Sequence, residues 1–505
     1  MDRGQKAVYN SFANAALQIV TVICGFILPR LILSSFGSSY NGIVASVTQF
    51  LSVISLLRAG VGGATRASLY KSLANKDIKQ ISSTIKATEI FMRKIALIFL
   101  GFVLLFSVLY PYLVQSDFSW TFSASLVLII SISTFVQYFF GISYQILFQA
   151  DQRQYVTVSF EIAAIILNTI IASLLIKAGV GIHGVKLCSA VAFSITPIAL
   201  NYLAKKQYKL DPKAKPDFSS INQRWDAFFH QAASFIHNNT DIVLLTVFTN
   251  VKVISVYNVY YMIAGGLRNV MNTLVTGVES AFGNILANKE DAVLRENLIN
   301  IETMLHVVSS FLFGAAIVLI TPFVQVYTRG VTDISYTRYI FGYLAIIGEI
   351  LFVLRSPYEA LVNAAGHFKQ TKKYAFIEAT INIIISVILV QFYDVIGVAI
   401  GTVTAILFRN IVYAVYASKV IVHRSILIYL KRIAITCITI ALTFGVSCFI
   451  NYGEMTSYLN WIVYAAKISA ISLLLTSMLN LLFYRDETSR MIRKFASIIK
   501  RIIKK

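Results

Sequence analysis

The chain has 505 residues, of which 57% are hydrophobic and only 13% are charged, and its mean hydropathy is +0.72. A soluble globular chain of this length could not cover so much apolar surface, so the composition predicts an integral membrane protein. The formal net charge is +21. A nucleic-acid-binding surface is a poor explanation for that charge, because the basic residues are scattered among short loops rather than gathered in one domain.

Long apolar stretches follow one another along the whole chain. A membrane-crossing helix needs about 20 such residues, and by this measure we expect an all-α polytopic protein with about fourteen spans. Helices are assumed because only helices and closed barrels satisfy the backbone in lipid. The predicted spans cover residues 9–33, 41–57, 91–114, 120–148, 156–176, 182–203, 228–248, 253–275, 298–326, 339–362, 374–392, 395–417, 433–450 and 461–483.

The basic residues also predict orientation, because lysine and arginine are retained on the cytoplasmic side of short loops. Most of the 44 lysines and arginines fall in the termini and in the even-numbered loops. The odd-numbered loops hold few, among them Lys177, Lys252 and Arg329. We therefore expect both termini in the cytoplasm and an even number of spans. Nothing before Tyr9 resembles a cleavable signal peptide, so the first span is expected to stay.

An internal repeat divides the chain. The sequence LANKD at 73–77 follows the second span, and LANKE at 286–290 follows the eighth. Glu161 and Glu378 recur at nearly the same separation, each before a glycine-rich turn. The repeat predicts two six-helix bundles in parallel orientation plus two further helices. The expected parts are an N-terminal lobe at 1–204, a linker at 205–224, a C-terminal lobe at 225–420, an appended helix pair at 421–484 and a basic amphipathic tail at 485–505.

Catalysis is not expected. The predicted loops are short, a Walker-type phosphate loop is absent, and Cys24, Cys188, Cys437 and Cys448 have neither metal-like nor redox spacing. We predict no enzyme, no metal site and no cofactor, with coupling to protons, sodium or the membrane potential left open.

Several arginines fall within or at the ends of apolar spans. A charge at the centre of a membrane helix costs roughly 2.5 to 3.5 kcal/mol on insertion scales, so these residues predict water, a counter-ion or an anionic substrate nearby. The candidates for binding an anionic substrate are Arg30, Arg58, Arg268, Arg355 and Arg409.

Three of these arginines also have a simpler interpretation. Arg30 and Arg58 stand near the ends of their spans, where a long side chain can reach the interface. Arg355 stands one helical turn before Glu359, which could neutralise it within the helix.

Polar residues at helical spacing predict the lining of a cavity, with interhelical packing as the alternative. The predicted lining residues are Asn14, Gln18, His230, His237, Asn272 and Tyr413. Asp241, Glu279 and Glu349 are carboxylates that could bind a coupling proton or sodium ion. For Asp241 the alternative is pairing with an arginine.

Three stretches resemble a known family. They are LRAGVG at 57–62, then His230 with NTD at 239–241 and VYNVY at 256–260, and NAAGHFK at 363–369. In these the chain resembles the multidrug, oligosaccharidyl-lipid and polysaccharide (MOP) exporter superfamily, and within it the polysaccharide transporters or O-antigen (Wzx-type) flippases. The family pattern often has an acidic residue at the position of Arg58, so this departure leaves the role of Arg58 open.

The resemblance implies a MATE-like fold and a flippase that carries an undecaprenyl-pyrophosphate-linked oligosaccharide from the cytoplasmic to the outer leaflet by alternating access, with cavity arginines on the pyrophosphate. It also implies a monomer in the bacterial cytoplasmic membrane, in contact with membrane lipids and possible partners such as a polysaccharide polymerase or glycosyltransferases. Two alternatives stay open: an ion-coupled extruder of small organic molecules, and a non-transporting scaffold of a polysaccharide synthase complex. An embedded glycosyltransferase ranks third.

Overall fold

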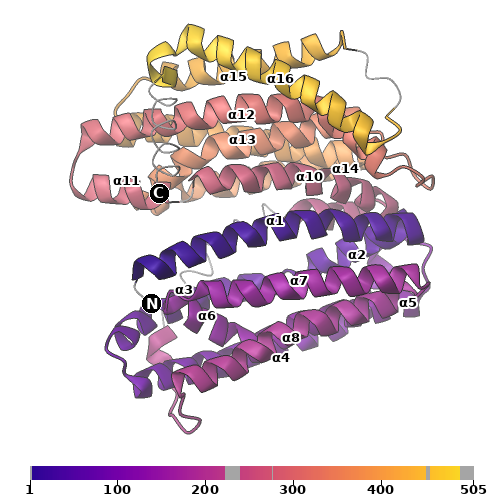
Figure 1. Ribbon diagram of the computed structural model, residues 1–505, viewed down its shortest axis with the longest axis vertical. Coiled ribbons are helices and arrows are strands. Elements are labelled where there is room, and N and C mark those ends of the chain that lie inside the picture. The colour runs from indigo at the N-terminus through magenta and orange to yellow at the C-terminus, as the bar shows by residue number, and fades with distance from the viewer. Residues whose placement is uncertain (1–2, 222–238, 276, 451–454, 490–505) are drawn as a thin grey trace. The chain divides into compact units, whose positions relative to one another are not determined.

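The computed structural model describes residues 3–221, 239–275, 277–450 and 455–489 (Figure 1). The described chain is helical, apart from an isolated bridge between Gln115 and Asn250. Contacts divide it into two compact units, Met1–Val256 and Tyr257–Lys505, called unit 1 and unit 2 below. The expected all-α polytopic fold is confirmed.

Unit 1 contains the first six predicted spans. Its helices are α1 (Arg3–Phe36), α2 (Ser38–Leu51), α3 (Ile54–Ala74), α4 (Ile78–Leu113), α5 (Trp120–Val136), the π-helix η1 (Gln137–Gly141), α6 (Ile142–Ala150), α7 (Gln154–Lys177), α8 (Ile182–Tyr208), the short 3-10 helix η2 (Phe218–Ile221) and a helix at Asn239–Phe248.

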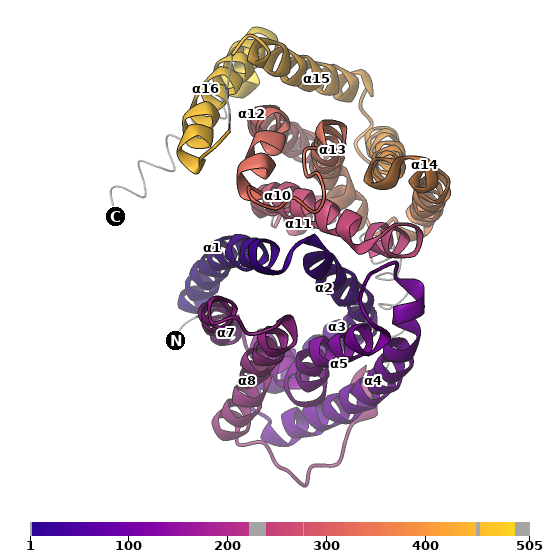
Figure 2. The same cartoon turned by 90° about the vertical axis from the view of Figure 1, so that its right-hand side faces the viewer.

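Unit 2 holds the remaining helices. They are most of α10 (Val251–Val275), then α11 (Val278–Ala287), α12 (Asp291–Tyr327), α13 (Tyr339–Ala364), α14 (Phe368–Tyr416), the π-helix η3 (Ala417–Ile421), α15 (Leu427–Ser447) and α16 (Tyr458–Phe483). The predicted appended pair corresponds to α15 and α16, which pack on α12 (Figure 2). Ser472 Oγ on α16 donates a hydrogen bond to the Phe311 carbonyl on α12, at 2.8 Å.

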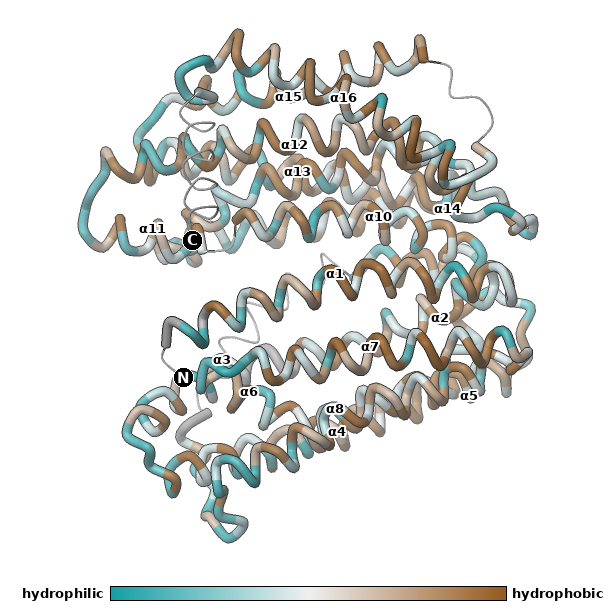
Figure 3. The backbone as a smooth tube through the Cα atoms, viewed as in Figure 1, coloured by the Kyte–Doolittle hydropathy of each residue, from teal (hydrophilic) through white to brown (hydrophobic). Residues whose placement is uncertain are grey.

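Ten described helices are long and apolar enough to cross a membrane. The segments Ser38–Leu56 and Val61–Ala74, bent by 45° at the break between them, make an eleventh when they are counted as one span. One of the ten, at 368–421, contains two predicted spans, because Asp394 breaks the helix with φ 48° and ψ −127°. The predicted spans at 228–248 and 253–275 correspond to the helix Asn239–Phe248 and to α10. Residues 228–238 of the first of these spans lie outside the described part of the chain. The chain is therefore a multi-pass membrane protein, and about fourteen spans agree with the described helices. Figure 3 shows hydrophobic residues along the helices and hydrophilic ones near their ends.

Unit 1 ends later than the predicted linker at 205–224. Its last residues pack against α2, where Asn41 Nδ2 donates to Ser255 Oγ at 2.8 Å and the Ser46 and Thr246 hydroxyls lie 2.8 Å apart. Gly42 is required at this contact, because a Cβ there would lie 1.7 Å from the Val251 carbonyl oxygen. Contacts thus assign residues up to Val256 to unit 1.

The repeated LANKD and LANKE sequences adopt the same turn. Asn75 and Asn288 both have φ −83° and ψ −3°, and the lysines that follow, Lys76 and Lys289, are left-handed with φ 54° and 56°. The two glutamates of the repeat match less well. Glu378 lies about one turn further from the start of its helix than Glu161 does.

Candidate functional site

A network of charged side chains is buried inside unit 2. We call Arg355, Glu359, Glu378 and Arg409 the arginine–glutamate cluster. Glu378, only 1% exposed, accepts a hydrogen bond from Arg355 at 3.0 Å on one carboxylate oxygen and from Arg409 on the other. Glu359 lies 3.3 Å from both arginines. Each arginine therefore contacts two carboxylates, and each carboxylate contacts two arginines.

The break in α14 brings half of this cluster together. Glu378 lies before Asp394 and Arg409 after it, so the two halves must fold back on each other for these side chains to meet. Two glycines allow that close approach. A Cβ on Gly397 would lie 2.3 Å from the Leu389 backbone, and one on Gly401 would lie 2.1 Å from Ser386 Oγ. The remaining two members, Arg355 and Glu359, are one turn apart on α13.

A further ion pair lies beside the cluster. Arg268 on α10 is 3.3 Å from the buried Glu349 on α13. The ring of Phe352 lies 5.1 Å from the Arg268 guanidinium carbon and 4.7 Å from that of Arg355, so it contacts both cations. The cluster and this pair thus form one continuous group of three guanidinium groups and three carboxylates.

The formal charges of this group cancel. Mutual pairing offsets the cost of removing ions from water, which is several kcal/mol for each ion. The neutralisation of Arg355 by Glu359, considered from the sequence as an alternative, is present in the structure. An anion that binds here must therefore displace a carboxylate from an arginine. Glu359 is the cluster carboxylate that can be displaced, because its side chain is 32% exposed.

Two other predicted residues contact this group or its helices. Tyr413 accepts a hydrogen bond from Arg409 at 3.0 Å. Glu279 is exposed and accepts a hydrogen bond from Asn363 Nδ2 at 3.3 Å.

The other predicted site residues lie elsewhere. Three of them lie on α1 in unit 1: Arg30 is half-buried, Gln18 is exposed, and Asn14 donates a hydrogen bond to the Asn10 carbonyl of its own helix. Asp241, also in unit 1, is buried. In unit 2, Asn272 is exposed on α10. His230, His237 and the side chain of Arg58 lie outside the described residues.

A second buried ion network was not recognised in the sequence. Glu302 on α12 binds Arg424 with both carboxylate oxygens and lies 3.7 Å from Arg432, which also pairs with Glu487 at 2.8 Å. The network joins α12, α15 and the residues after α16. Both arginines lie in the predicted cytoplasmic loop at 418–432, where basic residues indicate orientation and give no sign of burial.

Beside the cluster runs an apolar groove of about 460 Å³ on unit 2. Its walls come from α12, α13 and α15, including Ile317, Leu354, Ile440 and Phe444. Leu351 and Leu354 lie within one turn of Arg355 on α13, so the groove begins close to the charged group.

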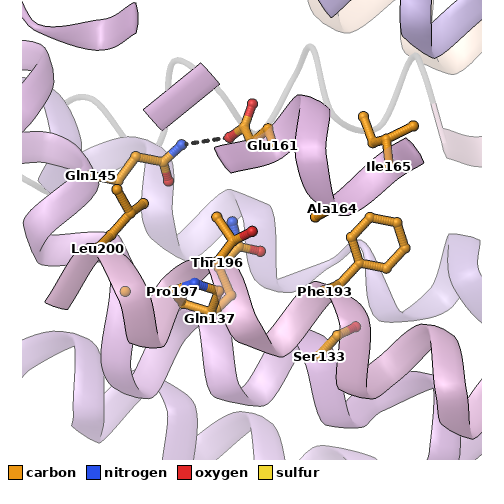
Figure 4. Close-up of a pocket in the computed structure, with 11 residues that line it drawn as sticks. Ser133, Gln137, Gln145, Glu161, Ala164, Ile165, Phe193, Thr196, Pro197 and Leu200 are labelled. Atoms are coloured by element: carbon orange, nitrogen blue, oxygen red, sulfur yellow. Dashed lines mark hydrogen bonds between the residues drawn. The ribbon is translucent and has the colours of Figure 1, made fainter. Parts of the chain in front are cut away.

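Unit 1 holds a cavity of about 230 Å³ between α5, η1, α6, α7 and α8, lined by both polar and apolar side chains (Figure 4). Gln145 donates a hydrogen bond to Glu161 at its edge, at 3.2 Å. A Cβ on Gly141 would lie 2.2 Å from Pro197 Cβ, so glycine allows the π-helix to approach α8. Within the described residues, no three His, Cys, Asp or Glu side chains are close enough to share a metal ion.

These features define a multi-pass helical membrane protein with paired charges buried inside its spans. Comparison with protein-family models and with curated proteins finds no match. Solved structures do match. The lipid II flippase MurJ, in an inward closed conformation, has a TM-score of 0.71 and 16% identity over 95% of this chain and 99% of its own.

Two transporters of the MATE family are also similar. An inward-facing multidrug-resistance member of the MOP superfamily has a TM-score of 0.64 and 11% identity, over 79% of this chain and 94% of its own. The eukaryotic transporter AtDTX14 has a TM-score of 0.56 and 14% identity, over 93% of this chain and 99% of its own. The chain therefore has the fold of MurJ and the MATE transporters, as the sequence led us to expect.

Proposed function

We propose that the protein is a flippase that moves a polyprenyl-diphosphate-linked oligosaccharide, a polysaccharide repeat unit, from the cytoplasmic to the outer leaflet by alternating access. The observation that carries the proposal is the position of the arginine–glutamate cluster beside the apolar groove. Such a substrate is a diphosphate joined to a long apolar chain. The arginines of the cluster suit the diphosphate, and the apolar groove suits the chain. The similarity in fold to a lipid II flippase supports the same reading.

The diphosphate would bind by exchange. Arg355 and Arg409 each lie 3.3 Å from the half-exposed Glu359 and closer to the buried Glu378. A diphosphate that replaces Glu359 would leave Glu378 in place, so the arginines would stay partly neutralised when the substrate leaves. Guanidinium groups hold phosphate oxygens bidentately, which favours the exchange over a single carboxylate contact.

The polyprenyl chain would lie in the apolar groove, whose volume of about 460 Å³ is in the range of ligand sites. The sugars would need polar surroundings, for which the predicted lining residues remain candidates. No bond is broken in this process, so the protein would act as a carrier and not as an enzyme. We place it in the bacterial cytoplasmic membrane, as a monomer with both termini inside.

The membrane potential could drive the cycle. Moving one charge through 100 mV is worth about 2.3 kcal/mol, so export of an anion from a negative-inside cell runs with the field. Ion coupling through Asp241, Glu279 or Glu349 is the competing proposal. Flipping measured with the potential collapsed but the ion gradients kept separates them, because unchanged activity would exclude the field.

The direct test is reconstitution. Purified protein in vesicles should move a polyprenyl-diphosphate-linked sugar to the leaflet where a membrane-impermeant enzyme can cleave it. Arg355→Gln with Arg409→Gln should abolish this movement. Arg424→Gln is the control, because it breaks another buried arginine–glutamate pair of unit 2 that does not line the groove. An equal loss of flipping activity in the double variant and in the control, at equal amounts of folded protein, would contradict a role of Arg355 and Arg409 in substrate binding.

One observation favours the extruder of small organic molecules. The cavity of unit 1 is lined by Glu161 and the ring of Phe193, and a carboxylate with an aromatic ring suits an organic cation. Export of a cationic dye that depends on Glu161 but not on Arg355 or Arg409 would establish that function instead. A non-transporting scaffold would support polysaccharide assembly in cells even when Glu161, Arg355 and Arg409 are all replaced.

A further inference from the structure

A second cavity of unit 1, of about 220 Å³, lies at the end of the unit that we predict to face the cytoplasm. Charged side chains from three segments line it. Lys86, Glu89 and Arg93 come from α4, Lys205 comes from the last turn of α8, and Asp211 comes from the loop that follows α8. Neither the proposed substrate site nor the cavity in Figure 4 includes any of these residues.

Local contacts hold this cavity in shape. On α4, Arg93 lies 2.6 Å from Glu89, and Lys86 lies 3.9 Å from the same carboxylate. On the facing wall, the Lys205 ammonium lies 5.7 Å above the centre of the Tyr144 ring on α6. The loop is fastened to α4 as well, because the backbone N–H of Asp211 donates to Ser82 Oγ at 3.0 Å.

The charge of the lining favours a single anion. Three cationic side chains face two carboxylates, so one positive charge of the lining is left without a balancing negative charge. Hydrogen-bond donors are also in excess. Arg93 Nε is buried and has no acceptor within the described residues. A phosphodiester carries one negative charge and accepts several hydrogen bonds, so it would satisfy both the charge and the donors.

The cavity also lies at the level of lipid phosphates. The long apolar run of α4 begins at Ile95, directly after Arg93 and Lys94, and the apolar part of α8 ends directly before Lys205. Basic side chains at such a boundary attract the anionic lipids of the cytoplasmic leaflet.

An apolar path leads away from the cavity. Helices α4 and α8 both pack on η1 and α6, so these two elements form the floor between them. Phe140 of η1 is exposed, as are Leu97, one turn after Arg93 on α4, and Tyr202, about one turn before Lys205 on α8. The Arg93 guanidinium carbon lies 5.1 Å from the ring of Phe139, which joins the charged cavity to this aromatic floor.

From this juxtaposition we infer that unit 1 binds a monoanionic glycerophospholipid of the surrounding leaflet, with its phosphate between Lys86, Arg93 and Lys205 and its acyl chains along α4, η1 and α8. The lipid would bridge α4 and α8 at the point where the 209–217 loop connects back to α4. The inference does not depend on what the protein transports.

The test compares lipids on the purified full chain in detergent. Phosphatidylglycerol should raise the midpoint of thermal unfolding in a saturable way, whereas phosphatidylcholine and inorganic phosphate should not. Lys205→Gln should weaken the apparent affinity for phosphatidylglycerol by about tenfold, or about 1.4 kcal/mol. Lys206→Gln is the matched control, since it removes the same charge one residue away and does not line the cavity. It should retain the wild-type response.

Native mass spectrometry adds a measurement that needs no variant. Wild-type protein given equal amounts of the two lipids should keep one phosphatidylglycerol molecule through mild activation. Equal retention of the two lipids would overturn the inference. So would equal stabilisation by inorganic phosphate, which would indicate a free anion, or an equal loss in Lys206→Gln, which would indicate attraction to diffuse surface charge. Flipping activity enters none of these outcomes.

Discussion

Arg355 and Arg409 share the carboxylate of Glu378, each on a different oxygen atom. The two arginines come from different helices, and the second is brought there by the break at Asp394. A single buried carboxylate thus joins α13 to both halves of α14. Since Glu359 contacts the same two arginines from its more exposed position, the two glutamates should contribute differently to stability and to binding.

We expect Glu378→Gln to destabilise unit 2 strongly. The substitution leaves two buried guanidinium groups with one carboxylate between them, and breaking a buried pair in this way costs about 3 to 5 kcal/mol. Glu359→Gln should cost at most about 1 kcal/mol, because its side chain is partly exposed to solvent. Denaturation midpoints of the two variants in the same detergent provide the comparison, and equal midpoints would show that Glu378 does not hold the cluster together.

Glu359→Gln should tighten the binding of a polyprenyl diphosphate. The neutral amide competes less well for Arg355 and Arg409, so the diphosphate no longer has to displace a charged group. Equilibrium binding of a labelled polyprenyl diphosphate to purified protein measures this effect, with Glu279→Gln as the control on an exposed carboxylate outside the cluster. Weaker binding in Glu359→Gln would contradict the exchange proposal.

Arg409→Lys should reduce flipping even though the charge is kept. Arg409 donates to Glu378, Glu359 and Tyr413 from one planar group, and an ammonium on a flexible stem cannot keep these directions together. The loss should appear in the initial rate in vesicles at matched amounts of folded protein. A rate equal to wild type would show that only the charge matters at this position.

The apolar groove predicts a steric effect. Ala441 lies on α15 within the groove, and Ala441→Trp should block it and slow the flipping of a long-chain substrate. Ala470→Trp on α16 is the matched control, because this alanine is exposed and does not line the groove. Rates measured with a full-length and with a shortened polyprenyl chain provide a second check, since the shorter chain should be less affected. Equal effects of the two tryptophans would argue against the groove.

Gly397→Ala should prevent the two halves of α14 from closing. Its Cβ would meet the Leu389 backbone, which cannot move aside as a side chain could, so we expect a cost of about 1 to 3 kcal/mol. Gly445→Ala on α15 is the control, because nothing lies within 4 Å of that Cβ and alanine favours a helix. The yield of monodisperse protein and its unfolding midpoint distinguish the two variants.

Much of the fold could be predicted from the sequence, because each span is a local apolar run whose meaning does not depend on its neighbours. The repeated LANKD and LANKE sequences, which indicate the duplication, also adopt the same turn at Lys76 and Lys289. The pairing of Arg355 with Glu359 was also visible, since residues one turn apart on a helix must be close. The role of Glu378 is not visible in the sequence, because its contacts with Arg355 and Arg409 depend on how α13 and the halves of α14 pack. The burial of Arg424 and Arg432 is not visible either, because it depends on how the predicted loop and α15 pack against α12.

The π-helix η1 fixes more than its own five residues. A π-turn takes one residue more than an α-turn, so it rotates everything that follows by about 100° relative to an uninterrupted helix. Gln145 lies on α6, four residues after the end of η1, so its hydrogen bond to Glu161 depends on this rotation. Deleting one residue between 137 and 141 would therefore point Gln145 toward a different neighbour with little change in the composition of the span. The number of residues in this segment thus helps to determine which side chains line the cavity of unit 1.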